Sequence, residues 1–465
     1  MSALTFAEFA SACGARWRGV SIGSGARFSP STDSRTLAAG EAFVALRGPS
    51  FDGNAFAAAA VARGCSALVL DNEASLPDPC PVPYMIVGDA KAAYLAGATA
   101  ARRDAPARVV GITGSTGKTT TKSMTAQLLA PAMRVLVTPQ NENNELGVAK
   151  LCYKMDESAD VAIVEMGARH PGEIAQLVDI AMPDVGVLTN IGEAHLEYFE
   201  DRADLARTKF ALFGRGARAV CSAADEWTRM LAAEAGIDRA AMWVRLQGDP
   251  QTPGLAIEAG LPRDGRVPVT LGASHSVAEW HLAGEHHLRD ALLAVGAAVL
   301  CGMSFERAIA GLAGLQLPEG RFELHPLPSG ATCVYDAYNA SPTSMAYALR
   351  AFADLPSRRR IAVLGSMAEL GADAPAMHEA TGAAAARVAL DMLYCGGPFA
   401  EQLMEGARRA GMTADMVVRF ESNEEIAHAL RASLGGGDTV LLKGSRVQRM
   451  EEILHMLLAA GKRAS

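Results

Sequence analysis

The chain has 465 residues, which suggests about three domains at roughly 150 residues each. Half of the residues are hydrophobic and 20% are charged, so the composition excludes a mainly disordered protein. The formal net charge of -8 argues against a general nucleic-acid binder, which would carry a basic domain or stripe. An anionic small-molecule ligand stays possible, because a few cations and backbone amides can bind one.

The sequence indicates a soluble, cytoplasmic protein without membrane insertion. Its longest apolar run, residues 291–305, is too short to span a bilayer and predicts a buried helix. The eight cysteines are scattered without a CxxC pair, which favours reduced thiols over a disulfide scaffold or a zinc site. The N-terminal segment carries Glu8 and no basic stretch, which argues against a signal peptide.

The first two predicted domains follow in chain order. In residues 1–104, short apolar runs at 42–46 and 67–70 flank a helix-like stretch, which predicts a small α/β domain. In residues 105–317, strands and helices alternate, which predicts a parallel sheet with crossover helices, as in P-loop ATPases. Within this central domain, 238–279 is rich in Gly and Pro and predicts an antiparallel excursion.

Residues 318–465 form the third predicted domain, after a linker-like stretch at 317–321. Apolar runs at 361–364, 392–395 and 439–442 are each followed by Gly and a helical pattern. This pattern predicts a Rossmann-like, doubly wound α/β domain. The fold class is therefore α/β throughout.

A phosphate-binding loop is the strongest local signal. The stretch 111–120 reads GITGSTGKTT, follows a predicted strand and opens a predicted helix. Its glycines allow backbone N–H groups to face phosphate oxygens, Lys118 supplies a cation, and the Thr119 hydroxyl can bind Mg²⁺. The pattern predicts ATP or GTP phosphates but leaves kinases, motors, switches and ligases open. The residues expected to hold the nucleotide phosphates are Gly114, Ser115, Thr116, Gly117, Lys118, Thr119 and Thr120.

Two further polar residues follow predicted strands, at the edge where open α/β sheets bind ligands. Glu165 ends one apolar run, and a carboxylate there can complete a Mg²⁺ shell. His195 follows the next run and is a candidate metal or phosphate contact. Lys209, by contrast, has the local pattern of a solvated helix lysine.

At these residues the chain resembles the Mur ligases, ATP-dependent amide-forming enzymes of peptidoglycan precursor synthesis. The phosphate loop, in which Gly111 is one place earlier than the first glycine of the common pattern GxxxxGK[ST], is similar to theirs. So is the stretch TPQNENNELG at 138–147. The resemblance extends through all three predicted domains. It is greatest to the branch of the family that adds D-alanyl-D-alanine. The stretches that carry this finer resemblance are EMGA at 165–168, PGEI at 171–174, YDAYNASPTSM at 335–345, LGSMAELG at 364–371 with His378 after it, and KGSR at 443–446.

The resemblance implies a reaction and two kinds of partner. The enzyme would use ATP and Mg²⁺ to join D-Ala-D-Ala to UDP-MurNAc-tripeptide through an acyl phosphate. The three domains would bind, in chain order, the UDP-sugar, ATP and the dipeptide, and the protein would act as a monomer.

The resemblance also implies residue roles. Lys118, His195 and Lys209 would be catalytic, and Lys209 sits where the family has a carbamylated lysine. Mg²⁺ would be held by Thr119, Glu165, His195 and Lys209. The nucleotide would also be contacted by His287, Arg321 and Asp336. The substrate-binding residues would be Ser34 and Arg35 for the uridine nucleotide, Asn141, Asn143 and Asn144 for the muramoyl peptide, and Asn339 and Ser341 for the dipeptide.

Some positions depart from the family pattern. His287 and Asp290 stand where the family usually has two asparagines, and Ser366 replaces a usual aspartate. These departures leave three alternatives open beside the main interpretation. The chain could be another Mur-type or folylpolyglutamate-type ligase, a P-loop ATPase switch, or a homologue that binds substrate and turns over poorly.

Overall fold

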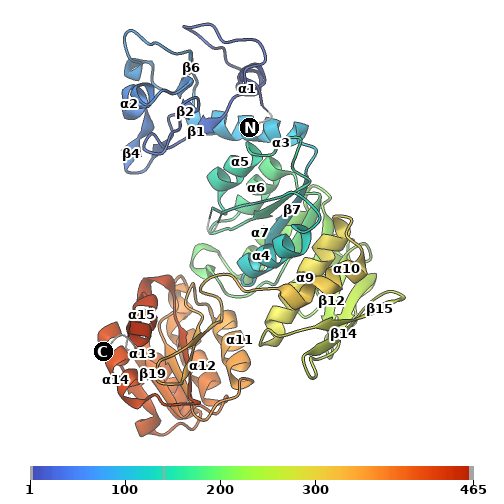
Figure 1. Cartoon of the computed structure of the whole chain (residues 1–465), viewed down its shortest axis with the longest axis vertical. Helices are drawn as coiled ribbons and strands as arrows, with labels where there is room; N and C mark the ends of the chain where they lie inside the picture. The colour runs from blue at the N-terminus through green and yellow to red at the C-terminus, as the bar shows by residue number, and fades with distance from the viewer. Residues whose placement is uncertain (1–3, 140–141, 460–465) are drawn as a thin grey trace.

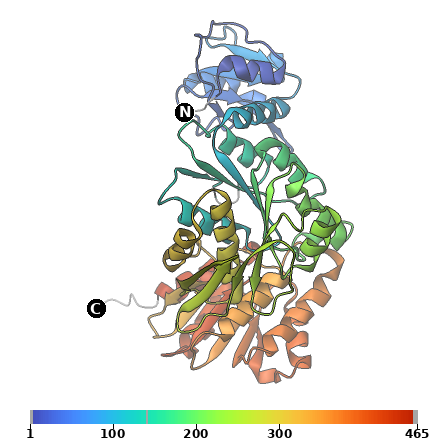
Figure 2. The same cartoon turned by 90° about the vertical axis from the view of Figure 1, so that its right-hand side faces the viewer.

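The computed structural model describes residues 4–139 and 142–459. Three α/β lobes, each with its own sheet, follow one another along the chain (Figure 1). Figure 2 shows the N-terminal lobe at one end of the long axis of the molecule. The predicted three-domain α/β fold is confirmed. In the part of the chain that the structure describes, no helix is both long and apolar enough to cross a membrane.

The N-terminal lobe is built on a parallel sheet of order β1-β2-β5-β6, beside which a short antiparallel hairpin, β3–β4, lies. The strands are β1 (Pro30–Ser31), β2 (Ala42–Val44), β3 (Arg47–Gly48), β4 (Phe51–Asp52), β5 (Ala67–Leu70) and β6 (Tyr84–Ile86), and the helices are α1 (Phe6–Cys13), α2 (Ala57–Ala62) and α3 (Ala90–Asp104).

Helix α3 attaches this lobe to the next one. Its Gly97 lies so close to Phe9 and Tyr153 that an added Cβ would come within 2.5 Å of both side chains. The Tyr153 hydroxyl donates to the Tyr94 carbonyl at 2.6 Å. Tyr153 belongs to the middle lobe. Side chains of the two lobes therefore share one hydrophobic core.

The middle lobe contains a nine-stranded sheet of order β8-β9-β7-β10-β11-β12-β13-β14-β15. The strands are β7 (Arg108–Thr113), β8 (Val135–Val137), β9 (Val161–Glu165), β10 (Val185–Leu188), β11 (Arg218–Ser222), β12 (Met242–Leu246), β13 (Leu255–Ala259), β14 (Arg266–Leu271) and β15 (Ser274–Glu279). The helices are α4 (Lys118–Leu129), α5 (Glu145–Cys152), α6 (Glu173–Ala181), α7 (Arg202–Phe210), α8 (Glu226–Glu234), α9 (Glu285–Leu300) and α10 (Phe305–Ala310), with a 3-10 turn η3 (Leu196–Tyr198).

Strand β7 determines where the site forms. It pairs in parallel with β9 on one side and β10 on the other, and Ile112 is in register with Glu165. The carboxyl ends of these three strands therefore lie side by side. Apolar residues on both faces, including Val109 on one and Val110 on the other, bury the strands between helices, so polar chemistry is confined to the strand ends.

Two predictions for this lobe were wrong in detail. Within 238–279, β12 and β13 pair in parallel, and only the β13–β14 and β14–β15 pairs are antiparallel. Gly248 and Gly254, both at positive φ, let the connecting segment double back. The helix predicted over 291–305 ends at Leu300, because Ser304 caps a new helix, α10.

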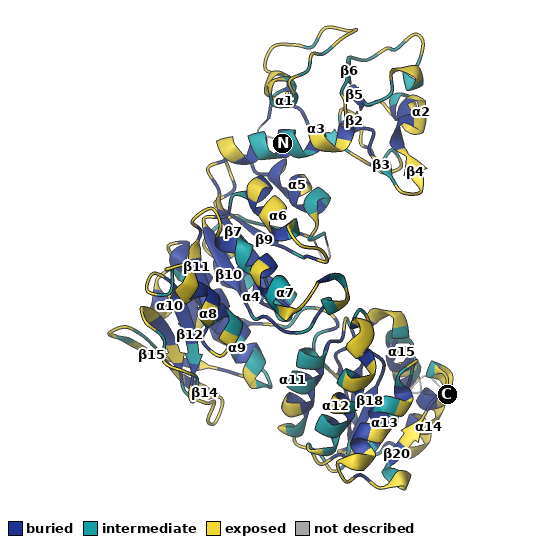
Figure 3. Ribbon diagram, turned by 180° about the vertical axis from the view of Figure 1, so that it is seen from behind, coloured by how far each residue is buried: buried dark blue, intermediate teal, exposed yellow. Residues whose placement is uncertain are grey.

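The C-terminal lobe is a doubly wound domain, as predicted. Its sheet has the order β16-β17-β21-β18-β19-β20, in which only the β16 edge strand is antiparallel. Buried strands lie between two helical layers (Figure 3). The strands are β16 (Glu323–Pro326), β17 (Thr332–Tyr335), β18 (Arg360–Leu364), β19 (Met392–Cys395), β20 (Val417–Arg419) and β21 (Thr439–Lys443). The helices are α11 (Pro342–Ala353), α12 (Ala374–Ala386), α13 (Ala400–Arg409), α14 (Asn423–Ser433) and α15 (Glu451–Ala459), with a 3-10 turn η6 (Gly371–Asp373).

Candidate active site

The phosphate loop connects β7 to α4, as its sequence predicted. Gly114 has a φ of 148°, and a Cβ there would lie 1.9 Å from the Thr189 hydroxyl oxygen. Gly117 has a φ of 79° and caps α4, and a Cβ there would lie 2.4 Å from an Asp290 carboxyl oxygen. Both positions therefore require glycine, for conformation and for space. The amino end of α4 faces the loop and favours an anion.

A second segment, Thr189–Gly192 at the end of β10, holds the loop in shape. The Asn190 carbonyl accepts from the Ser115 N–H at 2.9 Å, and the Asn190 side chain accepts from the Thr116 N–H and donates to the Thr116 hydroxyl. The Thr189 hydroxyl donates to the Thr116 carbonyl at 2.6 Å. These bonds fix the loop before any ligand binds, so a phosphate would meet a preorganised site.

Two lysine amines converge on one carbonyl oxygen of the loop. Lys118 Nζ donates to the Gly114 carbonyl at 2.7 Å, and Lys209 Nζ donates to the same oxygen at 3.4 Å. Lys209 is only 1% exposed, although its local sequence suggested a solvated lysine. Burial lowers the pKa of both amines, and for Lys209 the charge of Lys118 lowers the pKa further. Two neighbouring buried amines with carbonyl partners make a site that an anion would stabilise.

Glu165 lies on the other side of the loop. Its Oε1 accepts from the Thr119 hydroxyl at 3.3 Å and from the Asn143 amide at 3.1 Å. Its Oε2 is 3.0 Å from Lys122 Nζ, and both side chains are buried. The structure thus brings together Thr119 and Glu165, the two oxygen donors predicted for Mg²⁺, and places Asn143 beside them.

His195 reaches the same site from the loop after β10. Its Nδ1 pairs with the carboxylate of Glu369, which belongs to the C-terminal lobe. Burial and the charge of Lys118 lower the pKa of His195 to about 4, against the opposing charge of Glu369. The imidazole is therefore neutral near pH 7 and offers a lone pair.

The donor set is compatible with a hydrated divalent cation beside a triphosphate. A hydroxyl and a carboxylate supply oxygen ligands of the kind that Mg²⁺ prefers, and the neutral imidazole lies nearby. Within residues 4–139 and 142–459, no group of three or more His, Cys, Asp or Glu side chains forms a metal site by itself. A cation here would complete its shell with phosphate oxygens and water, as Mg²⁺ does at nucleotide sites.

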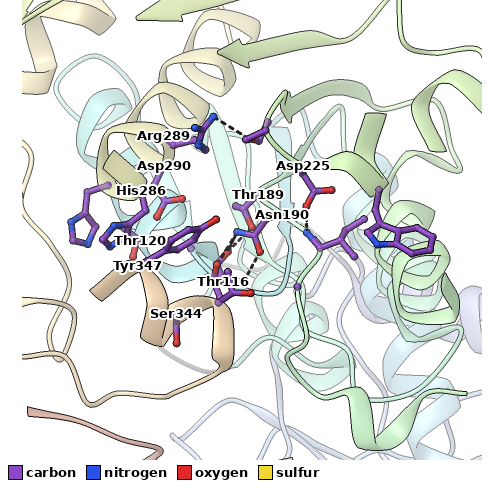
Figure 4. Close-up of a pocket in the computed structure, with 18 of the residues that line it drawn as sticks. Thr116, Thr120, Thr189, Asn190, Asp225, His286, Arg289, Asp290, Ser344 and Tyr347 are labelled. Carbon is purple, nitrogen blue, oxygen red and sulfur yellow. Dashed lines mark hydrogen bonds between the residues drawn. The ribbon is translucent and has the colours of Figure 1, made fainter. Parts of the chain in front are cut away.

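A cavity of about 390 Å³ opens beside the loop, between the middle and C-terminal lobes. Figure 4 shows Thr116 and Asn190 on one side and Asp290, His286 and Tyr347 on another. The rings of His286 and Tyr347 stack with centroids 5.3 Å apart and an interplanar angle of 13°. Such flat surfaces, together with the Trp227 ring that also lines the cavity, suit a planar heterocycle next to the phosphate loop.

The nucleotide-contact residues that were predicted beyond the loop line this cavity. His287 is 4% exposed, and its Nδ1 lies 2.5 Å from the Ala283 carbonyl. From the C-terminal side, Asp336 pairs with Lys443 at 2.7 Å, and the Arg321 guanidinium lies 4.4 Å from the centre of the Tyr338 ring. The structure therefore brings Arg321 and Asp336 to the same space as the loop.

The residues predicted to bind substrate lie in three places. Ser34 and Arg35 are in the N-terminal lobe, where Arg35 pairs with Asp33 at 2.8 Å and stays exposed. The Asn144 side chain caps α5, and the Ser341 side chain caps α11. The Asn339 carbonyl lies 3.4 Å from Lys443 Nζ. Asn141 is outside the described residues.

Several site residues carried no recognisable signal in the sequence. Asn190 has no distinctive pattern around it, yet its side chain holds the phosphate loop. Tyr347, His286 and Trp227 line the cavity from three helices, α11, α9 and α8. Glu369 lies in the stretch LGSMAELG at 364–371, but its contact with His195 joins residues 174 positions apart. Chain topology, rather than spacing, brings these groups together.

Three family models match the chain. They are described as "Mur ligase family, catalytic domain" over residues 31–112, "Mur ligase middle domain" over 112–298 and "Mur ligase, glutamate ligase domain" over 320–446. The chain is 35% identical to the UDP-N-acetylmuramoyl-tripeptide--D-alanyl-D-alanine ligase of Mycobacterium tuberculosis, over 92% of this chain and 91% of that protein.

Two solved structures are similar over nearly the whole chain. The MurF structure from Acinetobacter baumannii has a TM-score of 0.86 at 28% identity and covers 98% of each chain. The MurF ligase from Thermotoga maritima in complex with ADP has a TM-score of 0.78 at 27% identity, covering 92% of this chain and 97% of that one.

The pH dependence of stability tests the buried carboxyl of Asp290. Burial raises its pKa from 3.8 to about 8, so the folded chain retains a proton that the unfolded chain releases. The resulting contribution to the free energy of unfolding is complete below pH 3.8 and is lost as the pH rises through about 8. Asp290→Asn has no such proton to lose, so we expect its stability to fall less than that of the unchanged chain between about pH 5 and 9.

Urea denaturation at a series of pH values measures this difference. We expect the free energy of unfolding of the variant, relative to that of the unchanged chain, to rise toward alkaline pH by on the order of a few kcal/mol, at about 1.4 kcal/mol per pKa unit. Parallel stability curves for the two proteins would show that Asp290 is ionised in the folded chain across this range.

Proposed function

We propose that this chain, which belongs to the Mur ligase family, joins D-alanyl-D-alanine to UDP-MurNAc-tripeptide in peptidoglycan synthesis. The products are UDP-MurNAc-pentapeptide, ADP and phosphate. The observation that carries the proposal is the pair of lysines at Gly114, in a phosphate loop whose Thr116 and Gly117 line a nucleotide-sized cavity. Its support from relatives is the similarity to a D-alanyl-D-alanine ligase over 92% of the chain.

The use of ATP follows from the chemistry of amide formation. A carboxylate does not react with an amine at neutral pH, because oxide is a poor leaving group. In the proposed reaction, a terminal carboxylate oxygen of the tripeptide attacks the γ-phosphorus, and the bond to the β-phosphate oxygen breaks to release ADP. The dipeptide amine then attacks the carbonyl carbon of the acyl phosphate, loses a proton, and phosphate leaves with the carboxylate oxygen.

The phosphate loop reduces the repulsion between the two anions that react in the first step. The attacking carboxylate and the γ-phosphate are both anions, and they repel each other. Lys118 reduces this repulsion with a cation already held at Gly114, and the loop amides and α4 add partial positive charge. Mg²⁺ held by Thr119, Glu165, His195 and Lys209 would supply further neutralisation of the phosphate charge when bound.

Lys209 fits this role only in a modified form. As an ammonium it would repel both Lys118 and a metal cation. Burial and the charge of Lys118 hold the pKa of Lys209 well below its usual value, which favours the unprotonated amine, the form that reacts with CO₂. The carbamate would be an anion able to ligate Mg²⁺ and to pair with Lys118. This modification is part of the proposal.

The three lobes divide the substrates in this proposal. Residues 1–104, with Ser34 and Arg35, bind the uridine nucleotide, and 105–317 bind ATP. Residues 318–465, with Asn339 and Ser341, bind the dipeptide. Asn141, Asn143 and Asn144 lie toward the muramoyl peptide, and His287, Arg321 and Asp336 toward the base and ribose. Since one chain supplies all three parts, we take the catalytic unit to be a monomer that works in the cytoplasm.

Carbamylation of Lys209 is tested by ¹³C NMR of the full chain after exposure to ¹³CO₂. We expect one carbamate signal that is absent from Lys209→Arg, because the guanidinium of arginine does not form the adduct. Lys154→Arg, on an exposed turn, is the matched control and should keep the signal. A spectrum in which Lys209→Arg retains the signal would place the carbamate elsewhere.

ADP release in the presence of ATP and Mg²⁺, with each of the other two substrates present or omitted, tests the proposed reaction. We expect release that requires both UDP-MurNAc-tripeptide and D-Ala-D-Ala, together with a product of pentapeptide mass. Lys118→Ala should lower the rate on the order of a hundredfold or more, since it removes a charge that stabilises the transferring phosphoryl group. Lys154→Ala is the control for loss of a lysine.

Three results would contradict the proposal. Release that is independent of both substrates favours an ATPase switch, and dependence on a different amine favours another ligase of the family. Normal turnover by a folded Lys118→Ala variant would reject the assignment of the loop.

A further inference from the structure

The contact between Glu369 and His195 is a junction between two lobes. Glu369 lies in the loop between β18 and η6 of the C-terminal lobe, whereas His195 precedes η3 of the middle lobe. One carboxylate oxygen of Glu369 pairs with His195 Nδ1, and the other lies 3.3 Å from the Arg169 guanidinium. A single side chain of the C-terminal lobe thus holds two side chains of the middle lobe, on the side of the sheet where the phosphate loop lies.

The backbone on both sides of this contact adopts an uncommon conformation. His195 has a φ of 65° and Glu369 has a φ of 60°, in the left-handed region that residues other than glycine rarely occupy. Next to them, Gly371 has a φ of 63°, and a Cβ there would lie 3.4 Å from the Glu197 Cα. Two non-glycine residues in this conformation that face each other across an interface indicate a geometry selected for the contact itself.

The chemistry of the pair concerns the tautomer of the imidazole. A carboxylate at Nδ1 accepts a hydrogen bond, so it places the ring proton on Nδ1 and leaves the lone pair on Nε2. Histidines that bind metals are commonly oriented in this way by a carboxylate on the other ring nitrogen. His195 lies three residues after the Thr189–Gly192 segment, which is hydrogen-bonded to the phosphate loop, so it is on the same edge of the sheet as that loop.

We infer that Glu369 is a positioning residue, which orients His195 toward the metal–phosphate site only when the C-terminal lobe is docked on the middle lobe. This inference rests on the proposed function. Docking of the C-terminal lobe, which carries the dipeptide, would thereby complete the site where ATP reacts. The enzyme would then not cleave ATP before the dipeptide has bound.

A second contact nearby gives the docked arrangement its own stability. The Thr343 hydroxyl of α11 donates to Glu193 at 2.7 Å, and Glu193 also pairs with Arg202 at 3.2 Å. Because this contact does not involve His195, the lobes retain it across the interface when the Glu369 carboxylate is removed. A variant at Glu369 therefore tests orientation of the imidazole separately from docking.

Binding of Mn²⁺ to the full chain in the presence of ADP and D-Ala-D-Ala, followed by electron paramagnetic resonance, tests the inference without requiring turnover. We expect Glu369→Ala and Glu369→Gln each to weaken Mn²⁺ binding about 10- to 100-fold, as loss of an orienting partner typically does. Glu369→Gln keeps the shape of the side chain and guards against misfolding. Glu379→Gln is the matched control, because it removes a carboxylate that pairs with Arg409 on the same lobe.

A double-mutant cycle with His195→Ala identifies the route of the effect. If Glu369 acts through His195, Glu369→Ala should cause no further loss of Mn²⁺ affinity in the His195→Ala background. Additive losses, or unchanged affinity in both Glu369 variants, would overturn the inference and leave the pair as a contact between lobes. The substrate-omission assay on the unchanged chain is scored separately, so failure of the ligase reaction is distinguishable from failure of this inference.

Discussion

The convergence of two lysine amines on the Gly114 carbonyl is the constraint on which the site depends. One carbonyl cannot balance two neighbouring cations, and burial already lowers the pKa of both amines. The arrangement becomes favourable when anions enter: nucleotide phosphates beside Lys118 and, in our proposal, a carbamate on Lys209. The glycines and the Thr189–Gly192 segment keep the loop in the shape that holds these amines in place.

The lobes turn this electrostatic centre into a site for three substrates. Strand β7 lies between β9 and β10, so the phosphate loop at its end has Glu165 on one side and the segment leading to His195 on the other. The C-terminal lobe closes the remaining side of the cavity with Arg321, Asp336 and Tyr347, whose ring stacks on His286 of the middle lobe. Chemistry that must exclude water from an acyl phosphate gains from a site completed by docking rather than permanently open.

The sequence predicted those features that depend on neighbouring residues or on strand order. The phosphate loop is local, Glu165 ends β9 and His195 follows β10, and these two strands flank β7, so both features were accessible to inference from pattern. Other features depend on how distant segments pack, which sequence spacing does not encode. These are the burial of Lys209, the hydrogen bonds from Asn190 to the phosphate loop, and the Glu369–His195 contact. The parallel pairing of β12 with β13 was missed because glycines at positive φ in a short connection permit either orientation.

The most direct test of the account follows oxygen through the reaction. The tripeptide is prepared with ¹⁸O in its terminal carboxylate, and the phosphate released with D-Ala-D-Ala and ATP is analysed by mass spectrometry. Because the carboxylate oxygen attacks the γ-phosphorus and leaves with it, we expect one ¹⁸O atom in each phosphate. Phosphate without label, formed at the same rate as the amide, would contradict the acyl-phosphate route and the arrangement of the site built on it.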